Sequence, residues 1–156
     1  MELMKLQSDH KPGNCRVALA GVVRFYETLA PDTLDQLSGL YAADARFTDP
    51  FNDVVGIAAI TGIFQHMFTT VEAPRFEVTT RLLTGREAML GWDFHLRLRG
   101  RPVVIHGVTH LCFDTDGLVC LHRDYWDPAE ELYERLPIIG ALMRWLKKRL
   151  ASPGVG

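Results

Sequence analysis

The sequence predicts an α+β domain in which helices come first, an antiparallel β-sheet follows, and a further helix ends the chain. Two periodicities predict it. Apolar residues recur at three- and four-residue steps up to about Thr70, which is the spacing of amphipathic helices. After Pro74 they recur at every second residue, which is the spacing of strands. Short turn sequences separate the strand patterns, so consecutive strands are expected to be antiparallel.

Three helical patterns precede the strands. The first begins near Asn14, which can cap a helix, and its apolar face consists of Ala18, Val22, Phe25 and Leu29. The second, short helix follows Asp32 and has an apolar stripe of Leu34, Leu37, Leu40 and Tyr41. A brief extended piece, Ala45 to Thr48, then leads into a turn-rich loop, Asp49 to Asp53. The third helix is expected over about Ile57 to Thr70.

Four strand patterns come next, over residues 76–82, 92–98, 103–113 and 118–126. In the second of them one face carries Trp92, Phe94, Leu96 and Leu98. Asp114-Thr115-Asp116-Gly117 separates the last two strands and is a strong hairpin sequence. These strands therefore predict a sheet built from consecutive hairpins.

The C-terminal stretch, residues 138–150, is predicted to be an amphipathic helix. Its apolar face carries Ile138, Leu142, Trp145 and Leu146, and its basic residues are Arg144, Lys147, Lys148 and Arg149. A basic amphipathic helix can lie on a membrane, but more often it packs on its own domain. Packing is favoured here, as a lid or as part of a dimer interface.

Composition narrows the class of protein. A net charge of -2 provides no basic field for nucleic acid, and no run of about 18 apolar residues could span a bilayer. Three scattered cysteines suit a reducing compartment, and the N-terminus lacks a signal-peptide pattern, so a cytoplasmic protein is expected. The chain is divided into a polar leader (1–13), one domain (14–151) and a loose tail (152–156).

Sequence motifs for several chemistries are absent. No GxGxxG, P-loop, GxSxG or HExxH pattern is present, and no cofactor is expected. The cysteines lack CxxC spacing. His106 and His110 would lie roughly 13 Å apart on one strand, too far to share a metal ion. No metal site is therefore predicted.

Several short motifs occur in a characteristic order between Val22 and Trp126: Ala43-Asp44-Ala45, Thr48-Asp49-Pro50, Gly56, Gly100-Arg101, and Thr109-His110 before Phe113 and Gly117. With these motifs the stretch resembles ketosteroid isomerase and the SnoaL-like polyketide cyclases of the nuclear transport factor 2-like superfamily. It implies a cone-shaped roll in which a curved antiparallel sheet wraps around the first helices and leaves an apolar pocket. It also implies a homodimer formed through the outer sheet face. The residues expected at the pocket are Phe25, Trp92, Phe94, Leu96, Thr109, Leu111, Phe113, His122, Asp124 and Trp126.

Asp49 matches the general base of ketosteroid isomerase. A carboxylate beside an apolar cavity could take a proton from a carbon next to a carbonyl group. Alternatively, Asp49 only caps the turn that follows it. The two oxyanion donors of that enzyme are not matched, because Phe25 and Thr109 stand at their positions. Tyr26 is adjacent to Phe25 but projects about 100° around the helix.

The last strand carries a second pair of candidates. His122 and Asp124 share a face and lie roughly 6.5 Å apart along the strand, so their side chains can couple as acid and base. Trp126 on the same face would add a flat wall. Alternatively, the pair is a buried structural contact, or the strand faces the other way and presents Arg123 and Tyr125.

Two functions stay open. The first is a cofactor-free isomerase, cyclase or hydrolase that acts on a hydrophobic small molecule with Asp49, His122 and Asp124. The second is a non-catalytic protein of the same fold that binds an apolar ligand or serves as a dimeric accessory subunit. A cone filled by aromatic side chains, with Asp49 bonded only to its own loop, would favour the second.

Overall fold

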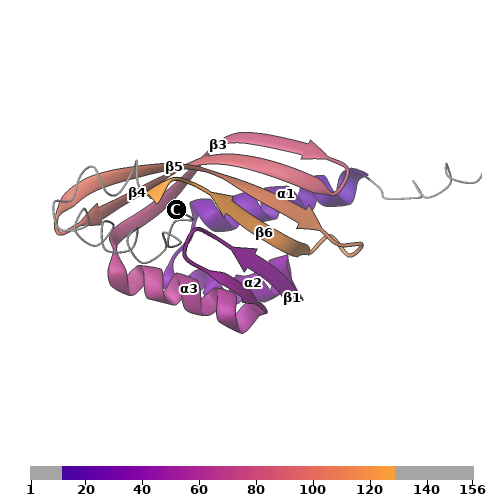
Figure 1. Cartoon of the computed structure of the whole chain (residues 1–156). Helices are drawn as coiled ribbons and strands as arrows, with labels where there is room; N and C mark the ends of the chain where they lie inside the picture. Colours follow the sequence, from indigo (N-terminus) through magenta and orange to yellow (C-terminus); the bar gives the residue numbers. More distant parts are fainter. Residues whose placement is uncertain (1–11, 129–156) are drawn as a thin grey trace, which may run out of the picture. The chain divides into compact units, whose positions relative to one another are not determined.

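The computed structural model describes residues 12–128, and those up to Trp126 belong to one compact unit (Figure 1). The helices are α1 (Pro12–Glu27), the 3-10 helix η1 (Pro31–Gln36), α2 (Leu37–Leu40) and α3 (Ile57–Thr70). The strands are β1 (Tyr41–Thr48), β2 (Asp53–Val55), β3 (Glu72–Thr84), β4 (Glu87–Leu98), β5 (Arg101–Phe113) and β6 (Val119–Tyr125). The predicted C-terminal helix and tail lie outside the described residues.

The six strands form one sheet in the order β2-β1-β6-β5-β4-β3. The hairpins from β3 to β6 are antiparallel, as the turn sequences predict. β1 and β6, however, run parallel, so the sheet is mixed and not purely antiparallel. The predicted antiparallel sheet is wrong at this one pair, because β1 is distant in sequence from β6 and no hairpin dictates their relative direction.

Two segments near the start of the sheet differ from the sequence prediction. Tyr41 is the first residue of β1, whereas its apolar neighbours had placed it on the second helix. Part of the turn-rich loop after Asp49 forms the short strand β2, whose Asp53 pairs with Thr48. Short apolar runs do not distinguish helix from strand, and here the pairing partners decide.

The core lies between the inner face of the sheet and α1 and α3. Figure 1 shows both helices on the concave side of the curved strands. α1 contributes Leu19, Val22, Val23, Phe25 and Tyr26, and α3 contributes Ile60 and Phe64, all buried. On β5 every second residue from Thr109 to Phe113 is buried, which places His110 and Cys112 on the opposite, outer face. Each fully buried large apolar side chain contributes about 1.5–3 kcal/mol.

The tight turn predicted at Asp114–Gly117, between β5 and β6, is confirmed. The Asp114 side chain accepts hydrogen bonds from the backbone N–H groups of Asp116 and Leu118, both at 2.9 Å. Gly117 has a φ of 80°, a conformation that glycine adopts without steric cost. The turn joins β5 to β6, and a one-residue shift of register between Cys112 and Phe113 then pairs Thr109 with Asp124. Within the described residues, no helix is long and apolar enough to cross a membrane.

Candidate functional site in the cone

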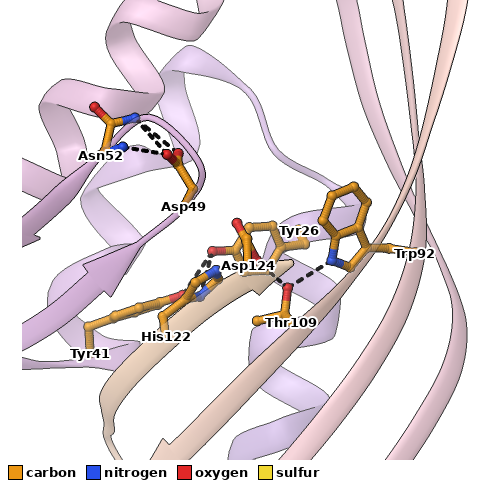
Figure 2. A network of polar contacts seen from close by, with 8 residues as sticks. All are labelled: Tyr26, Tyr41, Asp49, Asn52, Trp92, Thr109, His122 and Asp124. Atoms are coloured by element: carbon orange, nitrogen blue, oxygen red, sulfur yellow. Dashed lines mark hydrogen bonds and ion pairs between the residues drawn. The ribbon is translucent and has the colours of Figure 1, made fainter. Parts of the chain in front are cut away.

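Six side chains from five elements meet beneath the sheet (Figure 2). Tyr26 comes from α1, Tyr41 from β1, Trp92 from β4 and Thr109 from β5, while His122 and Asp124 both come from β6. Strand register brings them together: Thr109 is the β5 partner of Asp124. His122 is paired on its other side with Phe47 of β1, whose ring stacks on the imidazole at 4.5 Å.

Hydrogen bonds connect these six side chains into one continuous network. Tyr26 Oη lies 2.8 Å from Tyr41 Oη, and Tyr41 Oη lies 2.8 Å from His122 Nδ1. The other ring nitrogen, His122 Nε2, is 2.8 Å from Asp124 Oδ1. From the opposite side, Trp92 Nε1 donates to Thr109 Oγ1 at 2.8 Å, and Thr109 Oγ1 donates to the same Asp124 Oδ1 at 2.5 Å.

The positions of the protons in the network follow from the Trp92 indole, which stands at one end of it. An indole nitrogen can only donate a hydrogen bond, so the Thr109 hydroxyl accepts from Trp92. The hydroxyl then donates its own hydrogen bond to Asp124. Asp124 Oδ1 is therefore an acceptor, and His122 Nε2 donates to it. In the neutral imidazole Nδ1 is then the acceptor, and it accepts a hydrogen bond from the Tyr41 hydroxyl. All donors of the network point toward Asp124.

Burial differs sharply along the network. His122 is 1% exposed, whereas the side chain of Asp124 is 17% exposed. Burial raises the pKa of Tyr26 well above its ordinary value of 10.0, and Tyr41 and Asp124 raise it further. Burial also raises the pKa of Tyr41, although the hydrogen bond from Tyr26 opposes this. Both phenols are thus held protonated, and Asp124 is the most exposed side chain of the network.

A small cavity lies against Asp124. It is lined by Tyr26, Phe76, Val78, Leu90, Trp92, Thr109 and Asp124. The cavity has a volume of ≈ 10 Å³, about enough for one water molecule. Aromatic rings take up the space around it: Phe76 stacks on Phe94 with centroids 4.2 Å apart and meets Trp92 edge-on at 5.6 Å.

The family model of the SnoaL-like domain matches residues 22–122. The chain belongs to the SnoaL-like family. A Shewanella putrefaciens protein classed with the SnoaL-like polyketide cyclases has a similar structure, with 19% identity, a TM-score of 0.66 and coverage of 78% of this chain and 97% of that one. An LEH-like epoxide hydrolase of M. tuberculosis has 16% identity and a TM-score of 0.62, covering 90% and 98%. TerC, co-crystallised with polyporic acid, has 17% identity and a TM-score of 0.65, covering 75% and 94%.

At such identities the likeness extends to the fold. No curated protein sequence matches the chain. The predicted membership of the superfamily and the predicted α+β roll are confirmed.

The predicted site residues of this SnoaL-like protein fall into three groups. Trp92, Thr109 and Asp124 line the cavity, and His122 lies behind Asp124, in contact with it. Leu96, Leu111 and Phe113 are buried core residues outside the cavity wall. Phe94 stacks on Phe76, and Trp126 meets Phe51 edge-on at 5.4 Å. Of the two facings considered for β6, the structure has His122 inward and Arg123 exposed.

Asp49 is bonded within its own loop. Its Oδ1 accepts from the backbone N–H groups of Phe51 and Asn52, both at 2.7 Å, and the Asn52 side chain bonds both carboxylate oxygens at 3.1 and 3.0 Å. Figure 2 shows its carboxylate turned to Asn52, apart from the network of Asp124. The turn-capping contacts considered from the sequence are therefore present, and the role of Asp49 as a base stays a prediction.

Tyr26 and Tyr41 were not among the predicted site residues. Phe25 had been assigned to the pocket, but it packs edge-on against Phe64 at 6.2 Å, while its neighbour Tyr26 lines the cavity. Both residues are buried, so helical spacing alone does not say which of them faces the sheet. Tyr41 was missed because the sequence pattern placed it on the second helix. The signal available in the sequence was the presence of two phenols in apolar surroundings, because buried phenols need hydrogen-bond partners.

Proposed function

We propose that this SnoaL-like protein binds a small hydrophobic molecule in the cone and transfers a proton to or from it through Asp124, without a cofactor. The reaction class is that of an isomerase, cyclase or hydrolase. The observation that carries the proposal is the convergence of the Thr109 and His122 donors on one oxygen of Asp124 at the cavity wall. TerC, which has the same fold, has been co-crystallised with polyporic acid.

The geometry supports an acid–base role for Asp124. Both hydrogen bonds from described residues end on Oδ1, and none of the described residues bonds to Oδ2. Oδ2 can therefore exchange a proton with a bound molecule while His122 and Thr109 hold the carboxylate in place. His122 is covered by Asp124 and Phe47, so it acts by positioning Asp124 and by stabilising its charge. The aromatic wall of Tyr26, Phe76 and Trp92 suits a flat apolar ligand.

The volume of the cavity sets a condition on this function. A drug-sized ligand needs roughly 300 Å³ or more, and the space beside Asp124 holds about one water. Binding therefore requires the rings of Phe76 and Trp92 to move aside. A ligand that enters should change the fluorescence and the near-ultraviolet circular dichroism of Trp92.

The test separates binding from chemistry. Apolar cyclic ketones and polyporic acid are screened by saturation-transfer NMR, and ketones that bind are incubated in D₂O to measure deuterium uptake beside the carbonyl group. Asp124→Asn should keep binding within about threefold and lower exchange by at least about 10². Asp49→Asn should keep both and lose only the stability supplied by its turn. If Asp124→Asn exchanges as fast as the wild type, the acid–base role of Asp124 is wrong. Loss of exchange in Asp49→Asn alone would make Asp49 the base.

A non-catalytic binding or accessory protein is the second candidate. The nearly filled cone and the self-contained bonding of Asp49 favour it. It predicts that ligands bind, while no ketone that binds exchanges its protons faster than in buffer. In that case the network from Tyr26 to Trp92 serves to hold β1, β4, β5, β6 and α1 together.

We also propose that the protein forms a homodimer through the outer face of the sheet. Strand register places Leu82 beside Met89, and Val108 beside Tyr125, on this face, and all four side chains are exposed. Sedimentation equilibrium should give twice the monomer mass for the wild type. Val108→Glu should give the monomer mass, because a buried unpaired charge opposes association.

A further inference from the structure

Outside the cone, three side chains with different ligand atoms meet on the outer face of the sheet. They are Glu87 at the start of β4, and His110 and Cys112 on β5. One oxygen, one nitrogen and the sulfur all lie within 4.8 Å of one another. His110 Nε2 is 3.3 Å from Glu87 Oε2 and 3.6 Å from Cys112 Sγ.

These distances match a metal-binding arrangement. Zinc takes nitrogen and carboxylate oxygen at about 2.0–2.2 Å and thiolate sulfur at about 2.3 Å, so neighbouring ligand atoms of a tetrahedral site lie about 3.3–3.8 Å apart. Both measured pairs have this spacing or nearly so. A tetrahedral ion held by Glu87, His110 and Cys112 would need only small side-chain adjustments.

The backbone holds the three positions in place. Glu87 and Cys112 are directly paired across β4 and β5, and His110 is two residues from Cys112 on the same face. The backbone N–H of Phe113 bonds to the Arg86 carbonyl at 2.8 Å, which secures this end of the pair of strands. An open hollow lined by Glu87, Cys112, Asp114 and Cys120 adjoins the site and leaves room for a water molecule as a fourth ligand. Three protein ligands and one water is a coordination that zinc commonly has.

We propose that Glu87, His110 and Cys112 form a binding site for Zn²⁺, with water as the fourth ligand. The combination of carboxylate, imidazole and thiolate suits zinc. It does not suit Mg²⁺ or Ca²⁺, because these ions prefer sites made only of oxygen ligands. The spacing of residues in the sequence did not predict the site, because its ligands come from two strands and include no CxxC pair. The ion would fasten β4 to β5 at the end of the sheet next to the Thr84–Glu87 turn.

Proton release accompanies binding at this site. Burial and the nearby Glu87 carboxylate raise the pKa of the Cys112 thiol, against a smaller opposing effect of Arg86. The thiol is therefore protonated in the metal-free protein, and an ion that binds the thiolate must displace its proton.

The experiment uses Co²⁺ as a spectroscopic probe for the zinc site in the full chain. Titration should produce the near-ultraviolet absorption of a thiolate–Co²⁺ bond, and Zn²⁺ should displace it. Cys112→Ser should abolish the absorption, and His110→Ala and Glu87→Gln should each weaken binding by at least about tenfold. Excess Zn²⁺ should raise the Tm of the wild type by several degrees and leave that of Cys112→Ser unchanged.

The chain offers two matched controls. His106 lies on the same strand and face and bonds to Asp93 at 2.6 Å, which makes a histidine–carboxylate pair with no thiol beside it. The thiol of Cys120 lies 3.3 Å from the Cys112 carbonyl oxygen, near the site but outside the ligand set. His106→Ala and Cys120→Ser should bind Co²⁺ like the wild type. The proposal is overturned if Cys112→Ser keeps the absorption, if Cys120→Ser loses it, or if His110→Ala weakens binding no more than His106→Ala does.

Discussion

The indole ring of Trp92 covers Gly107 on the neighbouring strand so closely that a Cβ atom on Gly107 would lie 2.3 Å from it. The two residues are direct partners in the pairing of β4 with β5. The missing side chain of Gly107 thus makes the space in which the indole lies flat. In that position Trp92 reaches Thr109, and through it Asp124.

Gly107→Ala should therefore displace the indole and disturb the site. We expect a loss of about 1–3 kcal/mol in the free energy of unfolding, the usual cost of overpacking a core, together with a changed near-ultraviolet circular dichroism spectrum. Urea denaturation measures the first and the spectrum measures the second. Gly62→Ala on α3 is the matched control, since nothing lies within 4 Å of its Cβ position, and it should be neutral or stabilising. Equal stability of the two variants would contradict the packing described here.

Tyr41→Phe should cost more stability than Tyr26→Phe. Tyr41 Oη is 2.8 Å from His122 Nδ1, whereas Tyr26 Oη is 3.3 Å from it. Removing the nearer hydroxyl leaves a buried imidazole nitrogen with a poorer partner, which costs about 1–3 kcal/mol. Urea denaturation of both variants at pH 7.5 tests the order. If Tyr26→Phe is the more damaging, the proton order deduced for the network is wrong.

Alkaline pH should destabilise the protein through its two buried phenols. Their pKa values are raised on folding, so the stability that they contribute is fully present below pH 10 and is lost as the pH rises beyond it. Each phenol that ionises only in the unfolded chain removes about 1.4 kcal/mol per pH unit. Unfolding free energies measured from pH 9 to 11 should fall less steeply in the Tyr26→Phe/Tyr41→Phe double variant. A slope equal to that of the wild type would show that these phenols do not control the alkaline limit.

The order of elements could be predicted because it depends on local patterns. The spacing of Ile57, Ile60 and Phe64 is that of a helix, and α3 spans the residues expected of it. The Asp114–Gly117 sequence specifies a tight turn, and that turn makes β5 and β6 antiparallel neighbours, while a register shift at Cys112 and Phe113 sets which of their residues pair. His122 and Asp124 could be selected as a pair for the same reason, since alternate residues of a strand share a face.

The remaining features depend on contacts between distant segments. The parallel pairing of β1 with β6, the entry of Tyr26 and Tyr41 into the His122 network, and the meeting of Glu87 with His110 and Cys112 each join residues that no local pattern connects. By itself the sequence determined the α+β class, the hairpins and the shared face of His122 and Asp124, because periodicity and turn chemistry act over a few residues. Which face of β6 points inward was left open by the sequence, and the structure decided it. Only the tertiary structure decided which hydroxyls reach His122, that Asp49 bonds to its own loop, and that aromatic rings fill the cone, because strand register and packing place those groups.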